Sequence, residues 1–420
     1  DTRREFVANK RYFALNVLEE LDAPGEYCFD RANGVLYFWP PGDLETGEAL
    51  VSMVGQPLIS VQNVSHVTLS GLSVQCGRDI GIAATKVHDI AITDCEVFNV
   101  AGYGILLKGQ YSTVSGCDIH DTGEGGIDVE AGDRKTLAPS DVHIVNNHIH
   151  DYSKQMFTYR AGVRMLGSVG VVVANNLIEN APHIAIYFGG NDHVIERNEI
   201  RHVLLETSDA GAIYLGRDWT ACGTVVRDNY IHDLGNKRFE GADVNAVYFD
   251  DFSGGMKIIG NVIVRAGRAV LLGGGRSNLV AHNIFIDCIP AIHLDARGLT
   301  WASGWFTNPD NDSFVSMKEL NANQPPYTLR YPHLATIMDD ETAVPKYNVA
   351  EHNVFFGGRW LDLREKATDK ELTVRDNWTE GDPGFVDPAK GNFKLKANAP
   401  LRKVPWFQPP DMGAIGPQRK

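Results

Sequence analysis

The sequence contains no run of about 18 apolar residues, the minimum length for a helix that crosses a membrane. Basic residues are also in deficit, because 39 Lys and Arg stand against 53 Asp and Glu, for a net charge of −14. Such a surface repels a phosphate backbone. We therefore expect neither a membrane nor a nucleic acid as partner, and a neutral substrate rather than a polyanionic one.

Cysteine is scarce, and the six cysteines form no CxxC pair and no spacing typical of a zinc site. They are Cys28, Cys76, Cys95, Cys117, Cys222 and Cys288. We expect most of them to be buried thiols. No metal site and no cofactor are predicted, although a structural calcium ion could occupy a turn.

Two short patterns alternate from residue 63 to about residue 295. The first is a polar or small residue, a variable residue and then usually Ile or Val, at steps of 22, 30, 29, 22, 31, 32 and 22 residues. Its copies begin at Cys95, Cys117, Asn147, Asn176, Asn198, Asn229, Asn261 and Asn283. A base period of 22 with some longer turns predicts stacked coils ~4.8 Å apart, with the asparagines hydrogen-bonded in a ladder. The sequence thus predicts an all-β fold, a right-handed parallel β-helix of the pectate-lyase-like type, with about ten or more coils.

The second pattern is a small residue followed by an apolar, a variable and an apolar residue, as in Gly104-Ile105-Leu106-Leu107. Because side chains alternate along a strand, the variable residue points outward. The outward column comprises Leu106, Asp128, Arg164, Tyr187, Tyr214, Tyr248, Leu271 and His293. Its three tyrosines predict a flat strip on which a sugar ring could stack, unless a loop or a partner subunit covers it.

The patterns divide the chain into four segments. Residues 1–62 precede the repeats and are expected to form an opening or capping segment. Residues 63–297 form the predicted β-helix core with its groove. Residues 298–348 lose the period and are rich in Pro, Tyr and Trp, which suits a long loop beside the groove. Residues 349–420 should supply the last coils and a cover for the open C-terminal end of the core.

Carboxylates concentrate in two consecutive coils. Asp218 lies four residues after Tyr214, while Asp250 and Asp251 lie two and three after Tyr248, so all three are expected at one end of the strip. Asp209 should lie near the opposite edge unless its loop folds back. Glycoside hydrolysis requires two carboxyl groups. We therefore predict that the catalytic groups are among Asp209, Asp218, Asp250 and Asp251, unless Asp250 and Asp251 serve only the turn.

Crowding among these carboxyl groups should raise the pKa of one of them, and Arg217 should keep another ionised. The predicted substrate-binding residues are Tyr187, Tyr214, Arg217, Tyr248, Arg276, His293, Asp295, Arg297 and Trp301. Asp295 and Arg297 could instead pair with each other. More distant sugar contacts are expected from Asp128, Arg164 and Glu206, and a ladder role rather than metal binding from His120, His148, His150 and His232.

Several segments resemble the secreted right-handed β-helix proteins around glycoside hydrolase family 141. They are SDAGAIYLGRDWT, NYIHDLG, VYFDDFSGG, GGGRSN, HLDARGLTW and the early LDAPGEYCFDRANGVLYFWP. The resemblance implies enzymes that act on fucosides or xylans through two aspartates, with retention of configuration. It also implies that members of the family carry more chain ahead of the LDAPGE segment, so N-terminal coils or an accessory domain could be missing.

Two other functions compete with a glycoside hydrolase. A polysaccharide lyase or epimerase would need cations beside a uronate, which Arg164, Arg217 and Arg276 could supply, but the acidic surface disfavours it. A non-catalytic carbohydrate-binding β-helix would not need grouped carboxylates. The chain begins Asp-Thr-Arg-Arg without a hydrophobic leader, so we expect a mature or trimmed form of a secreted or periplasmic protein.

Overall fold

The computed structural model describes residues 14–235 and 244–418, in two compact units divided between Ser52 and Met53. The first unit contains a short 3₁₀ helix, η1 (Leu18–Glu20), and an antiparallel hairpin of β1 (Tyr27–Asp30) and β2 (Val35–Phe38). The Asn16 side chain closes this unit, because it bonds both the backbone N–H and the carbonyl of Phe29.

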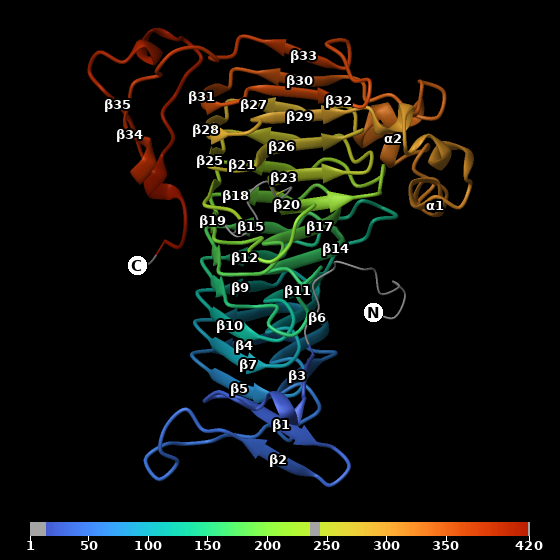
Figure 1. Cartoon of the computed structure of the whole chain (residues 1–420). Coiled ribbons are helices and arrows are strands. Elements are labelled where there is room, and N and C mark those ends of the chain that lie inside the picture. The colour runs from blue at the N-terminus through green and yellow to red at the C-terminus, as the bar shows by residue number, and fades with distance from the viewer. Residues whose placement is uncertain (1–13, 236–243, 419–420) are drawn as a thin grey trace. The chain divides into compact units, whose positions relative to one another are not determined.

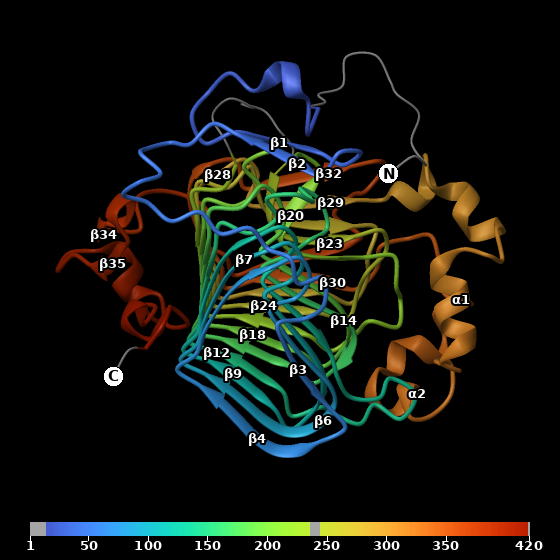
Figure 2. The same cartoon turned by 90° about the horizontal axis from the view of Figure 1, so that it is seen from below.

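The second unit is a coil of parallel strands, so the predicted right-handed parallel β-helix is confirmed (Figure 1). Each coil contributes one strand to each of three stacks, and strands of successive coils superpose along the axis (Figure 2). Stack 1 consists of β3 (Ile59–Gln62), the first part of β6 (Ile82–Thr93), β8 (Ile105–Gln110), β11 (Ile127–Glu130), β14 (Val163–Val169), β17 (Ile186–Asn191), β20 (Ala210–Gly216), β23 (Val244–Asp250), β26 (Arg268–Gly273), β29 (Ile292–Asp295) and β32 (Leu361–Arg364).

Stack 2 continues directly from stack 1 in each coil. It consists of β4 (Ser65–Ser70), the second part of β6, β9 (Thr113–Ser115), β12 (His143–Val145), β15 (Val172–Ala174), β18 (Val194–Glu196), β21 (Val225–Arg227), β24 (Lys257–Ile259), β27 (Leu279–Ala281), β30 (Asn348–Glu351) and β33 (Leu372–Arg375). Stack 3 consists of β5 (Ser73–Gly77), β7 (Glu96–Val100), β10 (Asp118–Thr122), β13 (His148–His150), β16 (Leu177–Glu179), β19 (Glu199–Arg201), β22 (Tyr230–His232), β25 (Val262–Val264), β28 (Ile284–Cys288) and β31 (Val354–Gly358).

The core lies inside the coil, where the inward side chains of the three stacks meet. On stack 1 the residue that precedes each outward position is fully buried, as in Ile105, Ile127 and Val163. Full burial of each such side chain contributes about 1.5–3 kcal/mol relative to exposure. The predicted alternation of inward apolar and outward variable residues is therefore what closes the coil.

The corner before stack 3 carries the predicted asparagine ladder. Its members are Asn147, Asn176, Asn198, Asn229, Asn261, Asn283, Asn353 and Asn377. Each side-chain amide donates to Oδ1 of the next member at 2.9 to 3.0 Å. The residue before each member has a left-handed backbone, which Gly260 adopts with φ +69° and Asn146 with φ 58°. A sharp turn therefore presents each amide to its copy one coil away.

Residues 298–348 leave the coil, as predicted, but they fold into short helices rather than a plain loop. These are η3 (Arg297–Leu299), which begins in the coil, η4 (Ser303–Thr307), α1 (Asp312–Glu319), α2 (Tyr327–Arg330) and η5 (Pro332–Ala335). Apolar side chains from this segment bury Trp219 and Phe252, which belong to the turns after β20 and β23. The segment therefore lies beside the carboxyl ends of these stack 1 strands (Figure 1).

The C-terminal segment does not take the expected place at the open end of the core. It contains β34 (Phe385–Asp387), η6 (Pro388–Lys390), β35 (Asn392–Leu395), η7 (Pro400–Lys403) and η8 (Met412–Ala414). Phe385, Phe393 and Leu401 pack on the outer face of stack 3, over Val262 and Ile284 among others. These outer positions are apolar, so stack 3 needs a cover on the outside. Both views place this segment on the far side of the coil from α1 and α2 (Figure 1, Figure 2).

None of the described helices is long and apolar enough to cross a membrane.

Candidate functional site

The outward column of stack 1 has the predicted register. Successive members pair directly, from Leu106 opposite Asp128 to Leu271 opposite His293. The column then continues one coil further than predicted, because His293 lies opposite Asp362. One line of side chains therefore runs along the coil axis.

The tyrosines in this column do not form an open strip. Tyr214 is 8% exposed and Tyr248 is 4% exposed, and only Tyr187 of the three is partly accessible. The ring of Tyr159, from the turn between β13 and β14, lies 5.9 Å from Tyr187 and 6.3 Å from Tyr214. Tyr214 and Tyr248 therefore offer almost no ring surface to a ligand in this conformation, and Tyr159 covers part of the column at Tyr187 and Tyr214.

The tyrosine hydroxyls instead hold two carboxyl groups. Tyr214 donates to Oδ2 of Asp250 at 3.0 Å, and Tyr248 donates to Oδ1 of Asp209 at 3.2 Å. The two rings are 5.4 Å apart. Burial raises the pKa of the Tyr248 hydroxyl, and the charges of Asp250 and Asp209 raise it further. Asp209 and Asp250 therefore meet around one pair of tyrosine hydroxyls.

Arg297 organises the carboxyl side of this group. It makes a bidentate pair with Asp295 at 2.8 and 2.7 Å, so the pairing alternative for these two residues is confirmed. It also donates to Asp250 at 2.5 Å and to Asp251 at 2.8 Å. Burial alone would raise the pKa of Asp295, but hydrogen bonds from Arg297 and His293 lower it to about 2. Asp295 is thus a fixed negative charge that anchors Arg297.

Asp251 is the member of the group with a raised pKa, first because of burial and then because of the charge of Asp250. Its side chain is almost fully enclosed and accepts hydrogen bonds from Arg217 at 2.9 Å and from Arg297. The crowding of carboxyl groups thus raises the pKa of one of them, as expected. That carboxyl group, however, faces two guanidinium groups rather than a substrate.

Asp218 belongs to a different group. Arg134 binds it at 3.0 Å, and the backbone N–H and hydroxyl of Thr220 bond its other oxygen. Within the described residues, no hydrogen bond joins Asp218 to Asp250 or Asp251. The turn after Gly216 carries Asp218 toward Arg134 and α2, away from the tyrosine hydroxyls.

The remaining predicted contacts divide by accessibility. Arg276 is buried and binds Asp340 together with three backbone carbonyls, so it holds the 338–347 turn. His293 is buried between Asp295 and Asp362. Trp301 is 58% exposed and lies 5.5 Å from the Arg297 guanidinium, and Arg217 is also exposed. Trp301 and Arg217 are the members of this set that a ligand can reach.

Sequence reasoning missed Arg134, Tyr159, Arg268 and Asp362. Arg268 lies near the negative charges of Asp362, Asp295 and Asp209. Arg134 and Tyr159 lie in the long turns that extend the 22-residue period, so turn length was the available signal for them. Asp362 stands in Leu361-Asp362-Leu363, the same apolar, variable, apolar pattern, beyond the point where the period was lost.

The imidazoles of stack 3 offer a group that could hold a metal ion. Ligand atoms of Asp118, His120 and His150 lie within 4.8 Å of one another. Asp121 and Asp151 bind the Nδ1 atoms of the two histidines, both at 2.7 Å. The imidazole rings stack 4.9 Å apart and nearly parallel, which also satisfies the ladder role expected from the sequence. His120 and His150 thus each have a carboxylate partner and a stacked imidazole neighbour.

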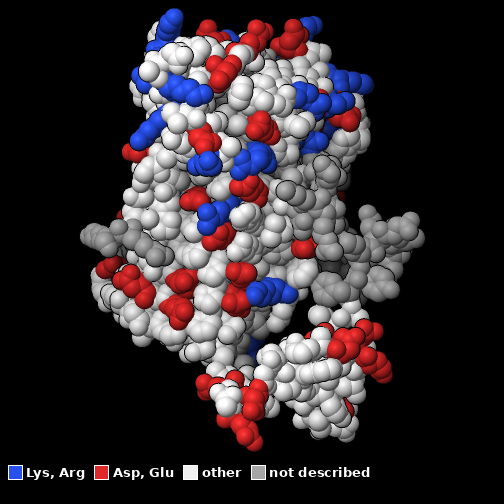
Figure 3. Space-filling model, turned by 60° about the vertical axis from the view of Figure 1, so that its left-hand side comes forward, with Lys and Arg blue, Asp and Glu red and all other residues white. Residues whose placement is uncertain are grey.

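Charges of both signs are interspersed on the face of the molecule in Figure 3, without a separate basic patch on that face. Ion pairs also join side chains of different coils, as between Arg201 and Glu179 and between Arg265 and Asp233. This face therefore offers no extended surface for a polyanion.

The chain is similar to several solved structures. One described as a glycoside hydrolase is 14% identical, covers 66% of this chain and 56% of its own, and has a TM-score of 0.43. A complex of XylC with xylose is 12% identical, with 88% and 66% covered and a TM-score of 0.42. The GH136 lacto-N-biosidase from Eubacterium ramulus is 13% identical, with 72% and 51% covered and a TM-score of 0.41. The chain thus spans little more than half of the first of these proteins.

No curated protein matches the chain in sequence. The model of the family described as "Right handed beta helix region" matches residues 47–159 and 161–316. This match covers more than half of the chain, and the protein therefore belongs to the right-handed β-helix family.

Proposed function

We propose that the protein is a glycoside hydrolase whose catalytic carboxyl groups are Asp250 and Asp209. The observation that carries the proposal is their meeting at the hydroxyls of Tyr214 and Tyr248. The two tyrosine rings that hold these carboxyl groups are 5.4 Å apart, and the carboxyl groups of glycosidase pairs are roughly 5 to 9.5 Å apart.

The two carboxyl groups differ in environment, as the two roles require. Oδ1 of Asp250 accepts hydrogen bonds from Arg297 and from the backbone N–H of Asp251, and Oδ2 accepts one from the Tyr214 hydroxyl. A carboxylate held in this way suits the nucleophile. Asp209 is exposed at the start of β20 and can reach a leaving oxygen, which suits the acid and base.

In the proposed reaction, Oδ2 of Asp250 attacks the anomeric carbon while Asp209 gives its proton to the departing glycosidic oxygen. The glycosyl ester on Asp250 is then cleaved by water, whose proton returns to Asp209. The configuration is retained, in line with the resemblance to family 141. Tyr214 and Tyr248 position the two carboxyl groups.

The test is hydrolysis of aryl glycosides, including fucosides and xylosides, and of xylan and other cell-wall glycans by wild type, Asp250→Asn and Asp209→Asn. Each substitution should lower kcat/KM by at least about 10²-fold, the typical loss for an acid–base group. Asp376→Asn, at an exposed carboxyl group far along the coil, is the matched control. Proton NMR should show that the first product has the same anomeric configuration as the substrate.

Asp218→Asn separates this pair from the one favoured by sequence spacing. If Asp218→Asn abolishes activity in a folded protein while Asp209→Asn does not, the pair is Asp218 with Asp250 or Asp251. Unsaturated uronate products would replace hydrolysis by lyase chemistry. Glycan binding without turnover would make the protein a carbohydrate-binding β-helix. Since cell-wall polysaccharides lie outside the cytoplasm, we also propose that the protein is secreted or periplasmic.

A further inference from the structure

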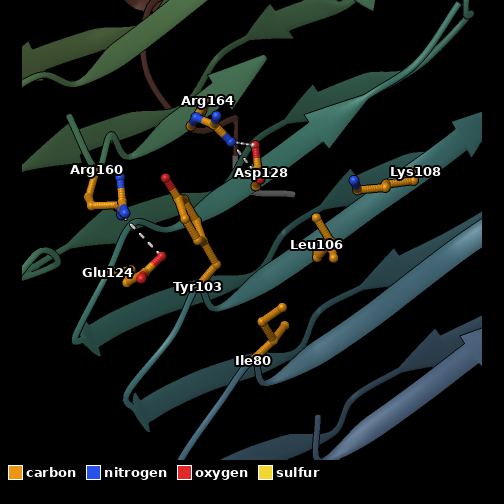
Figure 4. Close-up of a pocket in the computed structure, with 8 residues that line it drawn as sticks. All are labelled: Ile80, Tyr103, Leu106, Lys108, Glu124, Asp128, Arg160 and Arg164. Carbon is orange, nitrogen blue, oxygen red and sulfur yellow. Dashed lines mark hydrogen bonds and ion pairs between the residues drawn. The ribbon is translucent and has the colours of Figure 1, made fainter. Parts of the chain in front are cut away.

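A hollow lies on the outward column, toward the N-terminal coils (Figure 4). Its volume is about 300 Å³, the lower end of the range for ligand pockets. Leu106, Asp128 and Arg164 form its floor on β8, β11 and β14. Tyr103, Glu124 and Arg160 come from the turns that precede these strands. The hollow therefore lies on the same column as Tyr214 and Tyr248, which hold Asp250 and Asp209.

The charged groups around the hollow are matched in pairs. Arg164 binds both oxygens of Asp128 at 2.9 Å, and Arg160 lies 3.1 Å from Glu124. Lys108 at the margin is paired with Glu130, at 2.7 Å. Since each cation has its own carboxylate, the hollow has no net charge to complement a charged ligand. It does present donors and acceptors side by side, which is what a hydroxyl group uses.

Among the described residues, two buried polar atoms at the hollow make no hydrogen bond: the Tyr103 hydroxyl, and Nε of Arg160, which is ion-paired with Glu124. Tyr103 is 7% exposed, and its hydroxyl makes no hydrogen bond. Figure 4 shows this hydroxyl directed between the Arg160–Glu124 and Arg164–Asp128 pairs. The backbone at Gly125 presses on the Tyr103 ring so closely that a Cβ there would lie 2.4 Å from it. The ring is thus held in place, and a buried hydroxyl without a partner is unfavourable unless something binds it.

We propose that this hollow binds one neutral sugar ring of a glycan that extends along the column to the carboxyl pair. Leu106 offers an apolar surface to the C–H face of the ring, and the Tyr103 hydroxyl and the two ion pairs offer partners to its hydroxyls. From Asp128 to Tyr214 the column takes three steps, about 14 Å at coil spacing. The substrate class is then a neutral oligosaccharide longer than a disaccharide. This length requirement depends on the proposed hydrolase, whereas sugar binding in the hollow does not.

The test measures binding rather than turnover. Xylo-, cello- and manno-oligosaccharides of two to six units, and oligogalacturonates as anionic probes, are titrated into the full chain by calorimetry. Tyr103→Phe removes only the unpartnered hydroxyl and should lower the affinity for the best neutral ligand about tenfold. Leu106→Trp fills the hollow and should abolish that binding. Tyr111→Phe removes an exposed hydroxyl elsewhere and should bind as wild type does.

The proposal is overturned if Tyr103→Phe and Leu106→Trp bind like wild type, if no neutral oligosaccharide binds, or if oligogalacturonates bind in preference. Thermal unfolding of each variant shows whether it is folded; Tyr103→Phe breaks no hydrogen bond and should unfold at the wild-type temperature. Hydrolysis measured in parallel separates the two proposals. Tyr103-dependent binding without hydrolysis supports the hollow and rejects the enzyme, while hydrolysis with binding indifferent to both substitutions does the reverse.

Discussion

Substitution of Arg297 by Met should destabilise the protein strongly and in a pH-dependent way. Asp295 has a folded pKa of about 2 against an ordinary 3.8, so its ionised form stabilises the folded protein by on the order of 2 kcal/mol at pH 7. Asp250 and Asp251 each lose a charged donor as well. Removal of one partner from a buried ion pair typically costs about 3–5 kcal/mol. We expect a loss of about 4 kcal/mol in the free energy of unfolding at pH 7.

The sign of the pH dependence follows from the lowered pKa. In the wild type, the stabilisation from Asp295 is fully present above about pH 4 and is lost as the pH falls toward 2. Without Arg297 the carboxyl groups remain buried but become easier to protonate, so the variant recovers at acidic pH. The difference between wild type and variant should therefore shrink by more than about 1 kcal/mol from pH 7 to pH 4.

Urea unfolding at both pH values measures this difference. Arg364→Met is the matched control, because Arg364 pairs with Asp362 but its side chain is 59% exposed, and such pairs contribute at most about 1 kcal/mol. A loss below about 1 kcal/mol for Arg297→Met at pH 7, or an equal loss at pH 4, would refute the role given to Arg297.

Three further predictions concern the coil and its attachments. Asn198→Ala removes four buried hydrogen bonds and should lower the free energy of unfolding by about 2–4 kcal/mol, measured by urea. Cys76 should be the thiol that reacts with a disulfide reagent in the native protein at pH 8, because the other five cysteines are buried and burial raises the pKa of Cys117 to about 12. Reaction of Cys117 before denaturation would contradict this prediction. Trp219→Ala should loosen residues 298–348, seen as faster tryptic cleavage within them, whereas unchanged cleavage would show that Trp219 does not secure the segment.

The repeating part of the fold could be predicted from the sequence because the same two residue patterns recur in each coil. The asparagine corner and the column from Leu106 to His293 follow from alternation and period alone, and the structure has both. The continuation to Asp362 could not be predicted because the 51 residues of 298–348, which do not repeat, interrupt the pattern.

The site itself could be predicted only in part. Sequence spacing brought Asp250 and Asp251 to the end of the tyrosine column, but it could not show that Arg134 draws Asp218 away. It also could not show that Tyr159 covers Tyr214, because turn conformation depends on contacts between residues far apart in sequence. Column order is local information, whereas accessibility depends on the turns.

The asparagine ladder has a direction as well as a position. From Asn147 to Asn353, each side-chain amide donates one hydrogen bond to Oδ1 of the ladder member in the next coil, ending at Asn377, so the side-chain carbonyl dipoles of the ladder point the same way. Amides aligned in this manner polarise one another, and each bond strengthens its neighbours by about 10–30%. An interruption in the middle divides one polarised chain into two, whereas an interruption at Asn377 only shortens it. The same chemical change should therefore weaken the coil most at its centre, which gives a fold built from equal repeats an unequal distribution of stability.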